Sequence, residues 1–468
     1  MSFKLAVAVT LYASTFFLGA SAAPRSLVDW LNPNSTCSQI KNALSSSSAL
    51  CWPGTAEDVG KILQILAATN TSFAVKGGGH ASNPGFSSTT GVHISMTRFS
   101  EVTYHPESST ADIGAGNVWD TVYNVLEEQG VMVVGGRVTG VGVAGFTLGG
   151  GYSWLTNQYG LTIDTVVAFE LVLPNGTVTT VTESSNPDLM FALKGGYNNF
   201  GIVTKFTLKT FAQGQVWGGL LTFTENVIPQ VTAAAANFAA NVTDPKAGII
   251  TTYNFLLGEP GVSQILFYDG EEPPAGIFDE FLAIPHFTED IKTRSFSSLV
   301  QASPSNATSG TRGIFNTVSL LEYTPELLDT IVNETTYWGS TLQWSSGTFI
   351  SYDVEPFRPS LFSQGSTSTS AYPPSRAQPL LPLNLYFAYT DALQDQRFYD
   401  AIRQTAATIK AKAVSLGQAV ADAPMYGNYA IFSTPLETIY GEQLPRLRSI
   451  KQRYDPGNVM ALAGGWKI

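Results

Sequence analysis

The segment VKGGGH at residues 75–80 is the most informative stretch of this 468-residue chain. The segment SFAVK at 72–76 predicts a short strand that leads directly into the three glycines. Consecutive glycines expose backbone N–H groups with no side chain in the way, an arrangement that suits a pyrophosphate. Two further clusters follow, GGRVTGVGVAG at 135–145 and GGGY at 149–152. Each cluster alone reads more often as a tight turn, so their order along the chain carries the signal.

The composition excludes several classes of protein. Asp and Glu outnumber Lys and Arg by 36 to 25, giving a net charge of −11 and a pI of about 4.9. Because no Lys/Arg run is present, we expect no nucleic acid and no membrane partner. The 44% hydrophobic content rules out wholesale disorder. Two cysteines and four histidines match no zinc-ligand spacing, so no metal site is expected.

Residues 1–23 read as a cleaved secretory signal peptide. Lys4 supplies a positive charge, residues 5–18 form an apolar run too short to span a bilayer, and Ser-Ala-Ala at 21–23 offers a cleavage site. We therefore predict a secreted protein that is N-glycosylated. The Asn-X-Ser/Thr acceptor sites are at Asn34, Asn70, Asn175, Asn241, Asn306 and Asn333.

The two cysteines, Cys37 and Cys51, are expected to pair in an oxidising compartment. In the chain-entropy model such a bridge stabilises the fold by roughly 3 kcal/mol. The alternative is that they are two unrelated buried thiols.

Hydrophobic patterning predicts an α+β fold rather than a doubly wound sheet. In the first part, short strands alternate with glycine clusters and with amphipathic helices at 58–69 and 117–129. The second helix is expected to place four residues on one buried face, namely Trp119, Val122, Val125 and Leu126.

From 211 to 420 the glycine clusters thin out, and strand-like segments flank helical ones at 226–241, 325–333 and 395–416. This pattern predicts a separate antiparallel sheet with helices, inserted into the first domain. The Ser-, Thr- and Pro-rich segment 359–379 is expected to be an exposed loop.

The order of the motifs resembles the flavin-binding domain of the vanillyl-alcohol-oxidase superfamily, the PCMH-type FAD-binding domain. After the three glycine clusters come YGL at 159–161 and GGYNNFGIVT at 195–204, and the match resumes at YGNY (426–429) and RYDPGNV (453–459). Within the superfamily, the chain most resembles berberine-bridge-enzyme-like FAD-linked oxidoreductases of the secreted fungal type. The middle of the chain matches no motif.

The resemblance implies a PCMH-type FAD-binding domain of two α/β subdomains, an antiparallel-sheet substrate domain, and a C-terminal segment that returns to complete the flavin site. We place the signal peptide at 1–23, the FAD-binding domain at 24–212, the substrate domain at 213–420 and the C-terminal segment at 421–468.

The same resemblance implies FAD bonded covalently through His80 to the flavin 8α-methyl carbon; the alternative is an ordinary turn histidine. Relatives with doubly attached flavin have a cysteine where this chain has Val138, so a single bond is expected. The backbone of 77–81 is expected to hold the pyrophosphate, the main chain of Val203 to meet the adenine, and Asn428 to reach the polar edge of the flavin. The other cofactor-binding positions are Lys76, Gly77, Gly78, Gly79, Ala81, Gly140, Gly142, Gly145, Gly149 and Gly150.

Two tyrosines match positions at which the family places its catalytic base, Tyr152 and Tyr429. With 19 tyrosines present, a role for either as hydrogen-bonded core stays open. The family usually has an acid two places beyond the second tyrosine, where this chain has Ile431. A glutamate base from the substrate-domain sheet has no candidate within 383–391.

Three functions are consistent with the sequence. The first is a secreted, monomeric FAD-dependent oxidase that takes a hydride from a small alcohol or activated C–H substrate, a specialised metabolite, and passes the electrons to O2. The second is a carbohydrate oxidase, with Trp338 and Trp344 as candidates for sugar stacking; the valine at 138 favours the first. The third is a non-catalytic secreted glycoprotein with the same fold.

Overall fold

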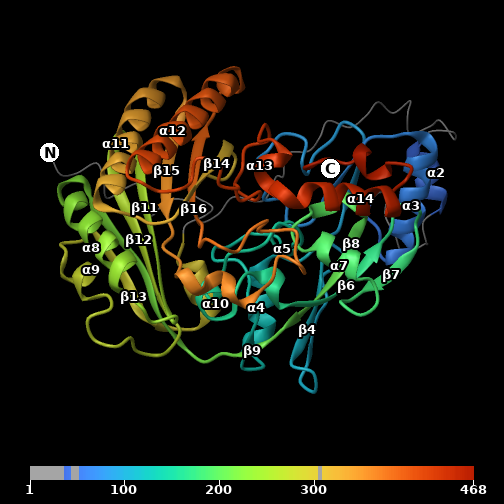
Figure 1. The fold of residues 1–468 in the computed structure, drawn as a ribbon, viewed down its shortest axis with the longest axis horizontal. Coiled ribbons are helices and arrows are strands. Elements are labelled where there is room, and N and C mark those ends of the chain that lie inside the picture. The colour runs from blue at the N-terminus through green and yellow to red at the C-terminus, as the bar shows by residue number, and fades with distance from the viewer. Residues whose placement is uncertain (1–35, 44–51, 304–307) are drawn as a thin grey trace.

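The computed structural model describes residues 36–43, 52–303 and 308–468, which form two lobes side by side (Figure 1). Each lobe is built around its own largely antiparallel sheet with helices packed against it. The α+β prediction is therefore confirmed. None of the helices within the described ranges is long and apolar enough to cross a membrane.

The first lobe contains a five-stranded sheet in the order β3-β4-β8-β6-β7. The strands are β3 (Val102–His105), β4 (Thr110–Gly114), β6 (Val166–Val172), β7 (Val178–Val181) and β8 (Ile202–Lys209). Buried and partly exposed residues alternate along part of β8, so one side of this strand faces the core. In the core Phe206 of β8 meets Phe169 of β6 edge to face. The helices of this lobe are α2 (Thr36–Ala43), α3 (Ala56–Thr69), α4 (Trp119–Glu127), α5 (Val143–Leu148), α6 (Thr156–Tyr159) and α7 (Pro187–Leu193).

Helix α3 shows how local sequence sets these boundaries. The Thr55 side chain accepts a hydrogen bond from the Asp58 N–H, which caps the first turn. Asn70 ends the helix in the left-handed conformation (φ 47°), and the chain then enters β1 (Phe73–Lys76). β1 pairs in parallel with β2 (Val92–Ser95), so the glycine loop begins where a buried strand ends. A second small pair joins β5 (Val131–Met132) to β9 (Phe211–Ala212).

The second lobe has a seven-stranded sheet in the order β13-β10-β12-β11-β15-β16-β14. Its strands are β10 (Val216–Thr224), β11 (Ala247–Leu256), β12 (Glu259–Tyr268), β13 (Thr288–Arg294), β14 (Arg312–Leu320), β15 (Gly347–Val354) and β16 (Leu381–Tyr389). Its helices are α8 (Ile228–Asn241), α9 (Asp279–Ala283), α10 (Phe296–Gln301), α11 (Pro325–Leu342) and α12 (Asp395–Ser415).

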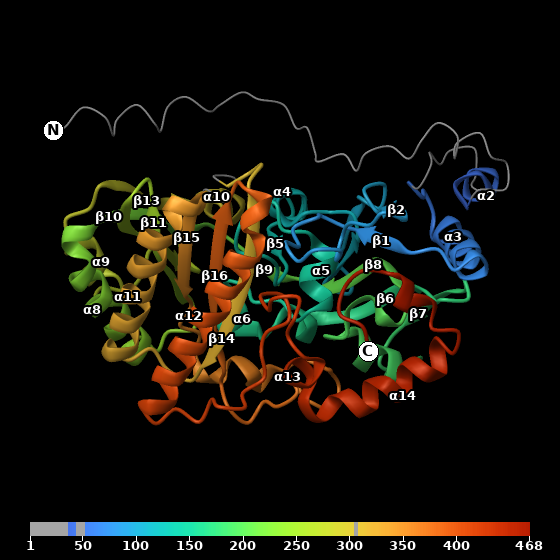
Figure 2. The same cartoon turned by 90° about the horizontal axis from the view of Figure 1, so that it is seen from above.

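The long helices α8, α11 and α12 cover one face of this sheet (Figure 2). Tyr253 of β11 donates to Thr232 of α8 at 3.0 Å, and the Tyr352 hydroxyl of β15 lies 2.9 Å from that of Thr405 in α12. Because side chains alternate along a strand, the neighbours of these tyrosines point to the opposite face, which turns toward the first lobe.

The C-terminal segment, with α13 (Leu436–Tyr440) and α14 (Leu444–Tyr454), crosses back to the first lobe. Ala463 forms a parallel bridge with Phe73, and the Asn199 side chain donates to the Trp466 carbonyl at 2.9 Å. The return thus rests on the base of β1, the strand that carries the glycine loop.

Three expectations need correction. In α4 the buried face is Trp119, Val122, Tyr123 and Leu126, and Val125 is exposed because it lies off that i, i+3, i+4, i+7 stripe. Segment 359–379 is not simply exposed: Ala371 is fully buried, and its N–H donates to the Lys194 carbonyl at 2.8 Å. Finally, β13, β14 and β15 were not predicted; β13 is a mostly exposed edge strand without a clear apolar alternation.

The segment 359–379 is held to the first lobe by a buried ion pair between Arg376 and Asp164, with Nη2 2.7 Å from Oδ1. We expect Asp164→Asn to lower the free energy of unfolding by about 3 kcal/mol, because it leaves a buried guanidinium without its partner. Asp188→Asn, which breaks the exposed pair with Arg453, is the matched control and is expected to cost less than about 0.5 kcal/mol. Calorimetric or denaturant unfolding measures both; equal losses would contradict this assignment.

Candidate active site

The glycine loop after β1 presents unpaired backbone donors. Within the described part of the chain, no protein acceptor receives a hydrogen bond from the amides of residues 77–81. Gly79 adopts a positive φ of 77°, and the Lys76 side chain folds against it, 2.5 Å from where a Cβ of residue 79 would lie. His80 and Ala81 follow on the exposed side of the loop. Such a run of free N–H groups fits the phosphates of a dinucleotide.

The second glycine cluster is packed against the first. A Cβ on Gly78 would lie 2.5 Å from the Gly142 Cα, so neither position tolerates a side chain. Nothing lies within 4 Å of the Cβ positions of Gly140 and Gly145. The two clusters therefore form a backbone cradle with open space beside it, which fits an extended cofactor.

The third cluster contacts the C-terminal segment. A Cβ on Gly149 would lie 2.1 Å from the Asn428 Oδ1, and one on Gly150 would meet the Tyr372 ring. Asn428 is itself held on both sides: its amide donates to the Phe146 carbonyl at 3.0 Å, and its oxygen accepts from Tyr197 at 3.0 Å. Asn428 thereby ties YGNY to the glycines.

Val203 is buried in β8 opposite Leu171 of β6. It lies beyond the part of β8 that pairs with β4, whose last partner is Lys205. Its role toward the adenine stays a prediction.

His80 lies between the two lobes. Its side chain is solvent-exposed, yet enough protein surrounds the ring that desolvation lowers the pKa of the imidazole. The ring centroid is 6.3 Å from that of Phe315 in β14, which in turn lies 6.5 Å from the ring of Tyr429. An accessible neutral imidazole fits the attachment of a flavin, and the Phe315 ring is a neighbour of both His80 and the second candidate base.

Tyr429 belongs to a buried charged cluster. Its hydroxyl accepts a hydrogen bond from Arg137 Nη2 at 2.9 Å and donates to Glu355 Oε1 at 3.1 Å. Arg137 also pairs with Glu355, Nη2 to Oε2, at 2.7 Å. Burial raises the pKa of Glu355, whereas the Arg137 charge opposes that rise. The cluster can accept a proton at Tyr429 and pass one to the carboxylate.

A second acid lies beside it. Asp353, two residues before Glu355 on the same face of β15, accepts a hydrogen bond from Asn384 at 3.1 Å. Burial and the nearby Glu355 charge raise the pKa of Asp353 to about 7. The proton that is held near neutral pH therefore belongs to Asp353, whereas Glu355 is paired with the Arg137 charge.

Tyr152 occupies a different environment. It is almost fully buried, its hydroxyl lies 3.2 Å from that of Tyr372, and its ring packs against Tyr426 and Phe357. Burial raises the pKa of Tyr152 and of Tyr429 above the ordinary value, so the two tyrosines differ in their partners: Tyr152 has no charged group bonded to its hydroxyl among the described residues. This arrangement favours a packing role over proton transfer.

Arg137, Asp353 and Glu355 were not identified from the sequence. Glu355 lies outside 383–391, directly after β15, a strand that was not predicted. The absent acid at Ile431 was the one available signal, since it implied that any carboxylate partner of Tyr429 must come from elsewhere. Among the described residues, no group of three or more His, Cys, Asp and Glu could hold a metal ion.

Comparison with known proteins identifies the family of the chain. Residues 47–182 match the FAD binding domain model, and residues 425–463 match the berberine and berberine like model. The chain is 31% identical over 443 residues to the FAD-dependent monooxygenase drtC of Aspergillus calidoustus, covering 90% of this chain and 83% of that one. It is 41% identical over 265 residues to an uncharacterized FAD-linked oxidoreductase of Arthroderma benhamiae, covering 56% of this chain and about half (52%) of the relative.

Among solved structures, a chitooligosaccharide oxidase matches with a TM-score of 0.71 at 21% identity, covering 89% of this chain and 91% of that one. The chain therefore belongs to the berberine-bridge-enzyme-like FAD-linked oxidoreductases. The predicted family, the PCMH-type fold and the enzyme assignment are confirmed, and FAD is its cofactor.

The acid pair gives a test of the site by pH. Asp353 holds its proton in the folded protein up to about pH 7, whereas in the unfolded chain it ionises near pH 4. Since the folded state binds more protons between these values, we expect this pair to make the free energy of unfolding fall as pH rises from about 4 to about 7. Asp353→Asn should flatten that slope, as measured by denaturant unfolding at several pH values. An unchanged slope would contradict the raised pKa.

Proposed function

We propose that this chain is a secreted oxidase that removes a hydride from a small alcohol or activated C–H substrate, a specialised metabolite, with O2 reduced to hydrogen peroxide. The observation that supports it best is the Arg137–Glu355–Tyr429 cluster, whose tyrosine shares the neighbour Phe315 with His80. When bound, the flavin supplies the hydride acceptor and its reoxidation by O2. The protein must supply orientation and a path for the proton.

Tyr429 is positioned to take the proton of a substrate hydroxyl. Its oxygen accepts from Arg137 and its own proton points to Glu355, so one lone pair is left for the substrate. As the substrate proton moves to the Tyr429 oxygen, the tyrosine proton moves to the Glu355 carboxylate. Arg137 hydrogen-bonds to both Tyr429 and Glu355, so its positive charge stabilises negative charge on either group.

The wall of rings beside His80 favours a flat or apolar substrate. Phe315 and Tyr386 lie on adjacent strands with centroids 4.5 Å apart, next to Tyr429. Of the two candidates for sugar stacking, Trp338 is mostly buried in α11 and donates to Glu334, whereas Trp344 is 85% exposed. The carbohydrate oxidase alternative keeps the fold similarity to a chitooligosaccharide oxidase in its favour.

Secretion, glycosylation and a monomeric state complete the proposal. The four sequon asparagines among the described residues, Asn70, Asn175, Asn241 and Asn333, are all exposed, as glycosylation requires. Asn34, Asn306, the signal peptide and the Cys37–Cys51 pair lie outside the residues whose side chains the structure describes.

We further propose a single covalent bond between His80 and the flavin. The secreted protein should keep its visible flavin bands in the pellet after acid precipitation, and His80→Ala should release them to the supernatant. The control is His93→Ala, because His93 lies in β2 and its ring contacts the Ser87 carbonyl at 3.1 Å, outside the glycine loop. Release of flavin from the wild type would contradict the covalent bond without touching the FAD assignment.

Substrate class and catalytic base can be tested together. Peroxide formation and flavin reduction are measured with a panel of aromatic alcohols and of oligosaccharides, and we expect turnover with the alcohols. Tyr429→Phe should slow flavin reduction by about a hundredfold or more, the usual contribution of a general base. Tyr152→Phe, the matched control, should slow it by less than about tenfold because it loses one hydrogen bond.

If only the oligosaccharides are turned over, the protein is a carbohydrate oxidase and the small-alcohol proposal is wrong. Flavin reduction without peroxide would contradict the oxidase assignment. A larger loss in Tyr152→Phe than in Tyr429→Phe would exchange the roles of the two tyrosines.

A further inference from the structure

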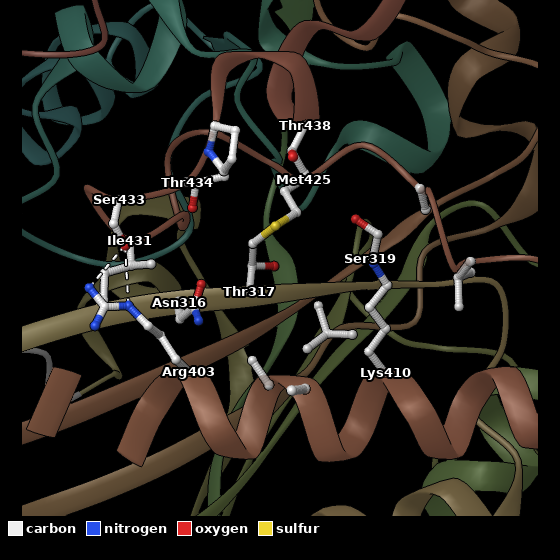
Figure 3. Close-up of a pocket in the computed structure, with 16 residues that line it drawn as sticks. Asn316, Thr317, Ser319, Arg403, Lys410, Met425, Ile431, Ser433, Thr434 and Thr438 are labelled. Carbon is white, nitrogen blue, oxygen red and sulfur yellow. Dashed lines mark hydrogen bonds between the residues drawn. The ribbon is translucent and has the colours of Figure 1, made fainter. Parts of the chain in front are cut away.

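A cavity of about 330 Å³ lies on the far side of β14 from His80 (Figure 3). Phe315 faces His80, whereas its neighbour Asn316 points to α12, where its amide donates to the Ile402 carbonyl at 3.4 Å. The cavity is open to solvent and is lined by residues of β14, of α12 and of the segment 420–438. Its volume lies within the range of small-molecule sites, and it is separate from the flavin site.

The body of the cavity is apolar. Its lining includes Val318, Ala406, Val420, Met425 and Ile431, which would bury a hydrophobic group of a ligand. Hydroxyl groups of Ser and Thr residues lie between them. A ligand that fills this space must therefore be partly apolar.

The charge of the lining is one-sided. In a chain of net charge −11, no Asp or Glu lines the cavity, whereas Arg403 and Lys410 both reach it from α12. Arg403 is engaged: its guanidinium donates to Ser433 at 2.9 and 3.2 Å and to Asp400 at 3.3 Å. Within the described residues Lys410 has no ion pair and no hydrogen bond, so its ammonium is left for an anion.

A buried polar atom in the wall also lacks a partner. Asn316 is only 3% exposed, and its Oδ1 accepts no hydrogen bond from any group that the structure describes. An unsatisfied buried acceptor costs free energy, and a ligand with a polar hydrogen removes that cost.

From these features we propose that the cavity is a second ligand site, which binds a small amphipathic carboxylate that also carries a hydroxyl group. The anion lies at Lys410 and the hydroxyl donates to the Asn316 Oδ1. The apolar body packs against Val318, Met425 and Ile431. Met425 and Ile431 flank the YGNY segment. An occupant would thus contact both ends of the stretch that carries Asn428 and Tyr429. The site goes beyond the proposed oxidase function, and its occupancy requires no turnover.

The test uses the full-length secreted protein with its FAD and measures binding by titration calorimetry. The probe is 6-hydroxy-2-naphthoate, whose hydroxyl hydrogen can reach the Asn316 Oδ1, and 6-hydroxy-2-naphthamide is the neutral probe of the same shape. We expect the carboxylate to bind at least about tenfold more tightly, a difference of about 1.4 kcal/mol. Lys410→Met should remove that preference, whereas Lys412→Met, two residues along the same helix and outside the lining, should keep it.

A second variant tests the site by blocking the cavity and leaves its charge unchanged. Ala407 lines the cavity from an exposed helix position, so Ala407→Trp should fill the entrance without disturbing the core and abolish binding. Binding that is absent in the wild type, unchanged in Lys410→Met and Ala407→Trp, or equal for the two probes would overturn the proposal. Flavin content and turnover serve as separate readouts, so failure of the oxidase proposal would leave this result interpretable.

Discussion

The contact between Arg137 and Glu355 is the interaction on which the rest of the site depends. Arg137 lies in the second glycine cluster of the first lobe, and Glu355 follows β15 in the second. Removing two charges from water costs free energy unless both are fully bonded, and here each also bonds to Tyr429 of the C-terminal segment. Three distant parts of the chain are thus held in one arrangement, because any displacement would leave a charge buried without its partner.

The cofactor site obeys a different constraint, which is steric. Gly78 and Gly142 approach so closely that no Cβ fits at either position, and this contact sets the distance between the two cofactor loops. Glycine is costly in a flexible chain, because it loses more conformational freedom on folding than other residues. The C-terminal return offsets part of that cost, since Ala463 bridges to Phe73 at the base of the first loop.

These two constraints explain which parts could be predicted from sequence. A requirement for glycine is visible in the sequence itself, so the loops at 77–79 and 140–150 were found and the family followed from their order. A requirement for a buried carboxylate is not visible, because Asp353 and Glu355 on a short strand resemble a solvated surface segment. Tyr152 shows the converse: its place beside the glycines suggested catalysis, but the direction of its ring depends on packing with Tyr372 and Tyr426.

The position of Glu355 in the second lobe determines how substitutions there affect the site. Glu355 shares its sheet face with Asp353 and Asn384, and Tyr386 and Phe315 continue that face toward His80. The residues that would contact a substrate therefore stand beside the group that would accept its proton. A substitution there would alter both the shape of this face and the electrostatic field at Glu355, whereas the packing of the glycine loops in the first lobe would be unaffected. If the proposed site is correct, substrate preference and proton affinity are for that reason coupled in the second lobe, and the first lobe can remain constant while both change.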